Sequence, residues 1–104
     1  MVELSPAFKQ AVEDSRKLTS KPENNDLLEL YALYKIANGE DITTAEKPGM
    51  FDLKGKYKYQ EWQKRVDEGI TQDKAQELYV AKVEELKNKY GFDANKEAEP
   101  VSRS

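Results

Sequence analysis

Glycine and proline divide this chain into four stretches, each with the residue period of an amphipathic helix. The five glycines and four prolines lie at or between the ends of these stretches, where they end helices rather than interrupt them. Within each stretch apolar residues recur at intervals of three and four, and nowhere do apolar and polar residues alternate as in a strand. A chain of 104 residues with this pattern is expected to fold as an all-α, four-helix domain.

The four predicted helices cover residues 6–18, 25–38, 55–66 and 71–90. Ser5 precedes a proline that suits the first helical position, so it is the predicted N-cap of the first helix. Thr71 is the corresponding candidate for the last helix, and Gly91 supplies its C-terminal stop. On the third helix Tyr59, Trp62 and Val66 fall on one face, which is expected to be buried.

The longest connection, residues 39–53, lies between the second and third helices and has neither a helix nor a strand period. Four apolar residues are expected to pin it to the body of the domain: Ile42, Met50, Phe51 and Leu53. A loop of this length in a short chain commonly carries function. Phe92 is expected to fold back onto the domain, which then spans residues 1–92, and the polar residues 93–104 are expected to form a flexible tail.

The composition makes several functions improbable. With no cysteine and no histidine, the chain lacks thiolate nucleophiles, the usual general base and the commonest metal ligand. Its formal net charge of −3 disfavours general nucleic-acid binding. The N-terminus does not read as a signal peptide, and the apolar runs are too short for stable membrane insertion. These features predict a cytoplasmic protein that is not an enzyme.

Tyrosines and lysines gather around the long loop. Tyr31, Tyr34 and Lys35 are spaced i, i+3 and i+4, so they are neighbours on one helix face. Lys54 and Lys58 add positive charge from the next helix. Rings for stacking, hydroxyl donors and ammonium groups together suit a ligand that is both aromatic and anionic, such as a nucleotide.

Simpler interpretations of the same residues remain open. Two tyrosines at this spacing on an apolar helix more often pack in the core than contact a ligand. Lysines on a short helix more often form a solvated surface. Tyr79 and Trp62, each on an apolar helical stripe, are also expected in the core. Spacing alone does not decide between these interpretations.

Three longer motifs identify a resemblance to a known family: LYALYK at 30–35, KPGMFDLKGKYKYQEW at 47–62 and AQELYVAKVEELKNKYG at 75–91. Together they resemble the acyl-CoA-binding protein family, over about residues 4–92. The resemblance implies an up-down-down-up four-helix bundle, with one long loop between its second and third helices, that binds fatty-acyl-CoA thioesters. It implies no cofactor and no metal.

The resemblance also implies roles for particular residues. Tyr34 would stack on the adenine, while Tyr31, Lys35 and Lys58 would hold the 3′-phosphate of the ribose. The full set implied for the coenzyme A head is Arg16, Tyr31, Tyr34, Lys35, Lys58 and Tyr79. The set implied for the acyl chain and pantetheine is Phe8, Ala11, Val12, Leu27, Leu28 and Lys54. Arg16 stands where the family usually has lysine, and Ser15 stands at a helix-packing position that is usually apolar.

The function expected from the resemblance is that of a monomeric carrier that buffers and delivers long-chain acyl-CoA, with transient contacts to membranes or acyl-CoA-using enzymes. An alternative is a helical protein-interaction module that uses the apolar surface of residues 27–37, although such a groove would not need the converging lysines. A thioester hydrolase comes last, because Ser5, Ser15 and Ser20 have no histidine to activate them.

Overall fold

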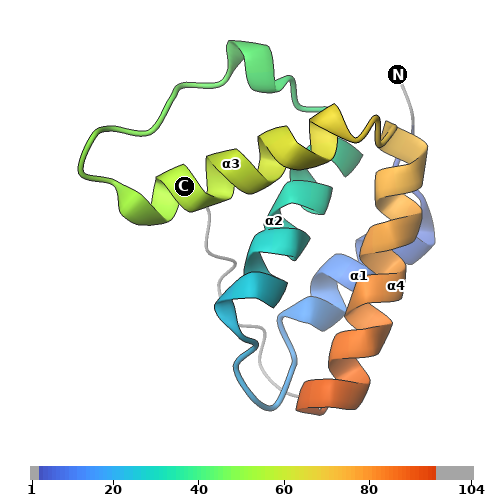
Figure 1. Ribbon diagram of the computed structural model, residues 1–104. Coiled ribbons are helices and arrows are strands. Elements are labelled where there is room, and N and C mark those ends of the chain that lie inside the picture. The colour runs from blue at the N-terminus through green and yellow to red at the C-terminus, as the bar shows by residue number, and fades with distance from the viewer. Residues whose placement is uncertain (1–2, 96–104) are drawn as a thin grey trace.

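The computed structural model describes residues 3–95 of the chain, which form four α-helices and one short 3₁₀ helix (Figure 1). In chain order these elements are α1 (Pro6–Ser15), α2 (Asn24–Ala37), η1 (Ile42–Thr44), α3 (Leu53–Asp67) and α4 (Gln72–Tyr90). Within the described residues the only β-type pairing is an isolated bridge between Leu18 and Phe92. The prediction of an all-α, four-helix fold is confirmed.

The helix ends follow from local side chains. The Ser5 hydroxyl accepts a hydrogen bond from the Phe8 backbone N–H, and the Thr71 hydroxyl accepts one from Lys74, as predicted for N-caps. Asp52 caps α3 in the same way through Gly55, so α3 begins two residues earlier than predicted. Helix α1 ends at Ser15 rather than near residue 18, because the chain there turns and extends to pair with residues 91–93.

Helix α2 lies at the centre of the fold. It packs against α3 on one side and α4 on the other, whereas α1 packs mainly against α4. The side chains of Phe8, Leu33, Val83 and Leu86 are completely buried where these helices meet. Because α1 and α2 both lie on α4 but contact each other little, the space between them is where a cavity can form.

The long connection between α2 and α3 extends away from the helices (Figure 1). Ile42 is buried in η1, as expected, but Met50, Phe51 and Leu53 are exposed by 75%, 93% and 62%. The prediction that these three residues pin the loop to the body is therefore wrong. Apolar character alone suggested burial, but no element of the described chain covers this turn. On α3, Trp62 is buried as predicted, whereas Val66 remains 37% exposed.

The end of the described chain returns to the connection between α1 and α2. The backbone N–H of Thr19 donates to the carbonyl of Gly91, and that of Asp93 donates to Lys17. The ammonium of Lys87 lies 4.4 Å from the centre of the Phe92 ring. Phe92 thus folds back as expected. Of the predicted tail, residues 93–95 are described and 96–104 lie outside the described residues, so the boundary at residue 93 stays a prediction.

Candidate functional site

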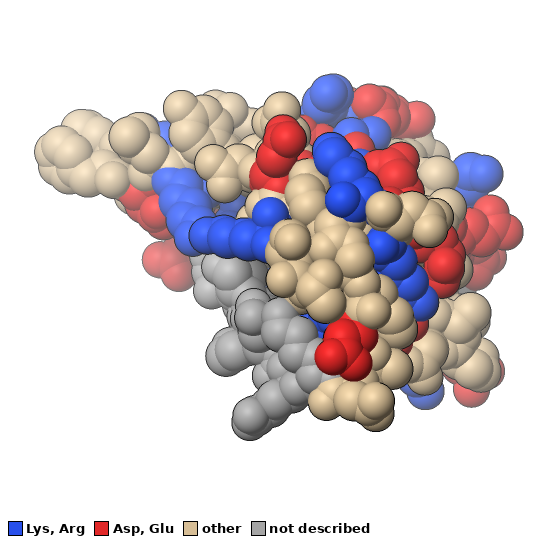
Figure 2. All heavy atoms as spheres, turned by 90° about the horizontal axis from the view of Figure 1, so that it is seen from below, with Lys and Arg blue, Asp and Glu red and all other residues tan. Residues whose placement is uncertain are grey.

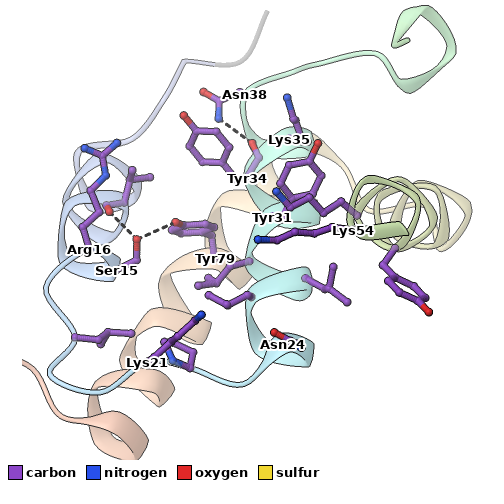
Figure 3. A pocket seen from close by; sticks show the side chains of 18 of the residues that line it. Ser15, Arg16, Lys21, Asn24, Tyr31, Tyr34, Lys35, Asn38, Lys54 and Tyr79 are labelled. Atoms are coloured by element: carbon purple, nitrogen blue, oxygen red, sulfur yellow. Dashed lines mark hydrogen bonds between the residues drawn. The ribbon is translucent and has the colours of Figure 1, made fainter. Parts of the chain in front are cut away.

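A large cavity lies between α1 and α2, with α3 along one side and α4 behind it (Figure 3). Its volume is about 1050 Å³, at the upper end of the range usual for small-molecule sites. In Figure 3, Arg16 comes from the end of α1, Tyr31, Tyr34 and Lys35 come from α2, Lys54 comes from α3, and Tyr79 comes from α4. The cavity is therefore built from side chains of all four helices.

Ten of the twelve predicted site residues line this cavity: Val12, Arg16, Leu27, Leu28, Tyr31, Tyr34, Lys35, Lys54, Lys58 and Tyr79. The other two, Phe8 and Ala11, do not line it and are buried in the core instead. The Phe8 ring is 5.1 Å from that of Tyr79 and 6.3 Å from that of Tyr34, measured between ring centres. Phe8 therefore supports two cavity-lining rings from behind.

The cavity is basic although the chain as a whole carries a formal net charge of −3. Five cationic side chains and one acidic side chain line it: Arg16, Lys21, Lys35, Lys54 and Lys58, with Glu40. Elsewhere the two signs are mixed, as Figure 2 shows for one face of the molecule. A local excess of positive charge in a concave site attracts anions.

The Tyr31 ring contacts two ammonium groups. The Nζ atoms of Lys35 and Lys58 lie 5.5 Å and 5.2 Å from its centre, within the range of cation–π attraction. Only 7% of Lys58 is exposed. This burial lowers the pKa of the Lys58 ammonium, and the nearby positive charge of Lys54 lowers that pKa further. An anion bound here would offset both effects, because it favours the protonated form of the lysine.

Lys35 also forms an ion pair across the edge of the cavity. Its Nζ atom lies 2.9 Å from a carboxylate oxygen of Glu40, which belongs to the loop that follows α2. Glu40 thus pairs with the ammonium of a lysine that lines the cavity. An incoming phosphate would compete with the Glu40 carboxylate for the same ammonium.

Two polar side chains from the end of α1 shape the opposite wall. Ser15 donates a hydrogen bond to the Val12 carbonyl and accepts one from the Tyr79 hydroxyl, at 3.3 Å. A polar residue is unusual at this packing position. Its hydrogen bond with the Tyr79 hydroxyl explains why a serine fits here. The Nε atom of Arg16 is a buried donor with no hydrogen-bond partner among the described residues. Because Arg16 lines the cavity, its guanidinium adds positive charge to this wall.

The sequence interpretation missed several lining residues. Most come from the connection between α1 and α2 and from the edges of the cavity: Leu18, Thr19, Ser20, Lys21, Pro22, Asn24, Leu30, Asn38, Glu40 and Tyr57. A connection has no periodicity to show which way its side chains face. The one available signal was the cluster of lysine, serine and threonine beside Pro22. No group of three metal-ligating side chains occurs within residues 3–95.

A family model described as "Acyl CoA binding protein" matches residues 5–83. The chain belongs to the acyl-CoA-binding protein family. An acyl-CoA-binding protein homolog of Manduca sexta is 48% identical over 83 residues, which are 80% of this chain and 90% of the relative. Homolog 1 of Caenorhabditis elegans is also 48% identical, over 82% of this chain and 95% of its own length.

The fold comparison agrees with this family membership. The crystal structure of acyl-CoA-binding protein 2 of Oryza sativa superposes with a TM-score of 0.70 and 33% sequence identity. The match covers 84% of this chain and 93% of the rice chain. The four helices that surround the cavity are thus arranged as in a solved member of the acyl-CoA-binding protein family.

Proposed function

We propose that this protein is a non-catalytic carrier of long-chain fatty-acyl-CoA thioesters, which it buffers and delivers. The observation that carries the proposal is the convergence of aromatic and cationic side chains with an apolar wall in one cavity. Acyl-CoA is an anionic nucleotide joined to an apolar chain, so it needs both kinds of surface. Family membership supports the same ligand and a role without catalysis.

The basic part of the cavity suits the coenzyme A head. Tyr34 offers a half-buried ring on which adenine can stack. Lys35 and Lys58, which both lie near the Tyr31 ring, offer two ammonium groups to the 3′-phosphate, and Arg16 and Tyr79 complete the set. Charge-assisted contacts of this kind are worth about 1.5–3 kcal/mol each when desolvated. Two or three of them with one stacked ring correspond to roughly micromolar affinity.

The apolar part of the cavity suits the acyl chain and the pantetheine. Val12, Leu27 and Leu28 line it together with the alkyl stem of Lys54. Each buried methylene of the chain adds about 0.8 kcal/mol, so the intact thioester should bind more tightly than coenzyme A alone. In this arrangement Phe8 and Ala11 serve the acyl site from the core, by fixing the position of the helix that carries Val12.

The two other functions considered from the sequence receive less support. A protein-interaction module would need the apolar face of α2 to be open, but Leu30, Leu33 and Ile36 are already buried within the domain. A hydrolase would need an activated nucleophile. The Ser15 hydroxyl, which lines the cavity, hydrogen-bonds to a carbonyl and to a tyrosine, and neither acts as a general base at neutral pH.

Calorimetric titration with palmitoyl-CoA, coenzyme A and palmitate tests the proposal. We expect the thioester to bind more tightly than either half, because head and chain each contribute contacts. Equal affinity for palmitate and palmitoyl-CoA would contradict the assignment of Lys35 and Lys58 to the phosphate of the coenzyme A head. Absence of binding to all three ligands would overturn the carrier function.

We further propose a monomer that works in the cytoplasm and meets membranes or acyl-CoA-using enzymes only transiently. No helix within residues 3–95 is both long and apolar enough to cross a bilayer. The monomer is supported by the burial of Leu30, Leu33 and Ile36 of α2 within the chain's own core. Sedimentation equilibrium with and without ligand measures this state directly, and a dimer in either condition would contradict it.

A further inference from the structure

The end of the loop before α3 exposes an unusual amount of apolar surface. Four side chains, Met50, Phe51, Leu53 and Tyr57, are exposed by 75%, 93%, 62% and 58%, and we call them the apolar tip. Among the described residues the only other exposed large apolar side chains are Leu27 and Val66, at 37% each. Clusters of this kind on a folded protein commonly mark a contact surface.

The apolar tip is held in place by polar contacts. The Asp52 backbone N–H donates to the Gly49 carbonyl at 3.1 Å, which closes a turn around Met50 and Phe51. The Asp52 carboxylate caps α3 through Gly55, and the Lys56 ammonium donates to the Met50 carbonyl at 2.8 Å. These bonds satisfy the turn's polar groups and leave its apolar side chains outside the core.

The charges around the apolar tip are mostly basic. Along the chain the apolar tip is flanked by Lys47, Lys54 and Lys56, against Glu46 and Asp52, whereas the whole chain carries a net charge of −3. The carboxylate of Asp52 is engaged as the N-cap of α3. Apolar side chains with lysines beside them in the chain suit a surface that offers hydrocarbon beneath negative charge.

The apolar tip also reaches the cavity. Leu53 and Tyr57 are four residues apart on α3 and so share a face of the helix. Tyr57 and its neighbour Lys54 both line the cavity. Apolar surface therefore runs from the projecting turn to the cavity's edge, which would bring the cavity next to whatever the turn contacts.

We propose that the apolar tip inserts into the surface of a bilayer that contains anionic phospholipids, with the flanking lysines at the level of the headgroups. Two side chains on the projecting turn and two at the start of α3 are far fewer than the roughly 20–30 residues per partner of a specific protein interface. Interfacial insertion needs only a short apolar segment, because it reaches about 5–10 Å below the headgroups. The inference does not depend on which ligand the cavity holds.

Vesicle flotation of the ligand-free, full-length protein tests this inference. Vesicles of phosphatidylcholine alone are compared with vesicles that also contain phosphatidylserine. We expect the wild type to partition onto the anionic vesicles and Phe51→Ala to reduce its partition coefficient about tenfold, through loss of inserted apolar area. Val66→Ala is the matched control, since it removes an exposed apolar side chain from the far end of α3.

The charge contribution is measured with a second pair of variants. Lys47→Gln should weaken binding to anionic vesicles at low salt but not at high salt, where the surface charge is screened. Lys64→Gln, near the other end of α3, should have no effect. Because Phe51 and Lys47 lie outside the cavity wall, calorimetric titration of both variants with palmitoyl-CoA should match the wild type.

Three results would overturn the inference. They are a wild type that binds neither kind of vesicle, a Phe51→Ala variant that binds as well as the wild type, and equal losses in Phe51→Ala and Val66→Ala. Light scattering over a range of protein concentrations supplies a further check. Self-association that Phe51→Ala abolishes would assign the apolar tip to a second copy of the chain instead of a bilayer.

Discussion

Single residues in this protein often serve both the core and the cavity. Tyr79 is 96% buried, since only 4% of it is exposed, yet it also lines the cavity through its position behind α1 and α2. Burial raises the pKa of its hydroxyl, which therefore remains a protonated donor to Ser15. The same tyrosine thus packs in the core and also lines the cavity.

Lys35 provides the sharpest test at the level of one residue. Its ammonium lies 5.5 Å from the centre of the Tyr31 ring and 5.6 Å from that of the Trp62 ring. We predict that Lys35→Ala weakens binding of coenzyme A by about 1–3 kcal/mol, through loss of one charge-assisted contact. Calorimetry measures the change, with Lys64→Ala on α3 as the control. Unchanged affinity in Lys35→Ala would remove this residue from the phosphate site.

At the level of elements, α2 and α4 are joined by a buried carboxylate as well as by apolar packing. Asp26 of α2 accepts hydrogen bonds from Tyr90 at 2.6 Å, from Lys82 at 2.9 Å and from Lys89 at 3.2 Å, all on α4. The Tyr90 hydrogen bond, followed by that from Lys82, lowers the pKa of Asp26 to about 2. This cluster lies away from the cavity, so it stabilises the scaffold without taking part in binding.

The depressed pKa of Asp26 predicts a pH-dependent stability. Because the folded pKa lies below the unfolded value of 3.8, the stabilisation is complete above pH 4 and is lost as the pH falls towards 2. Its size is about 2 kcal/mol, at 1.36 kcal/mol per pKa unit. Urea unfolding of Asp26→Asn and the wild type should therefore differ most above pH 4 and converge near pH 2.

The control for this experiment is Asp73→Asn, at an exposed position in the first turn of α4. This variant should keep the acid-dependent loss of stability seen in the wild type. An Asp26→Asn variant that keeps the same loss would show that Asp26 is not its source.

Two glycines test how the end of α4 docks on the connection after α1. Gly91 and Gly69 both adopt positive φ, at 83° and 78°. A Cβ atom at Gly91 would collide with the Thr19 hydroxyl, whereas one at Gly69 would meet nothing within 4 Å. We predict that Gly69→Ala costs about 1 kcal/mol of unfolding free energy, through backbone strain alone, and that Gly91→Ala costs more.

Denaturant unfolding of the two variants gives this comparison directly. Equal losses in Gly91→Ala and Gly69→Ala would contradict the prediction that a side chain at residue 91 collides with Thr19. Gly91 also combines its positive φ with a ψ of 155°, a region that is essentially restricted to glycine, so the extra cost of Gly91→Ala contains backbone strain as well as the collision with Thr19.

At the level of the whole molecule, the cavity separates α1 from α2, and these two helices are connected mainly through their packing on α4. Helices α1 and α2 both pack on α4, and a ligand between them would contact both. A ligand that binds only the folded state stabilises it by an amount that depends on its concentration relative to Kd. The carrier is therefore expected to be more stable when loaded than when empty.

We predict that palmitoyl-CoA at about 100 times its Kd raises the free energy of unfolding by about 2.7 kcal/mol. Removal of the ligand should return the stability to that of the free protein. Urea unfolding monitored by circular dichroism at matched concentrations of palmitoyl-CoA, coenzyme A and palmitate measures the effect. A denaturation midpoint that does not move with palmitoyl-CoA would contradict binding to the folded state.

The sequence by itself determined the features that depend on neighbouring residues. Four helices, the capping roles of Ser5 and Thr71, and the shared face of Tyr31, Tyr34 and Lys35 all follow from spacing and short-range hydrogen bonds. The family resemblance extended this local information to twelve site residues, ten of which line the cavity.

Only the tertiary structure decided which apolar side chains are covered. Phe8, expected to line the acyl-chain site, lies behind the cavity, and Phe51, expected to pin the loop to the body, projects from the domain. The connection after α1 lines the cavity because residues 91–93 pair with residues 17–19 and hold it there. Burial depends on which distant segment meets a given face, and no local pattern of residues contains that information.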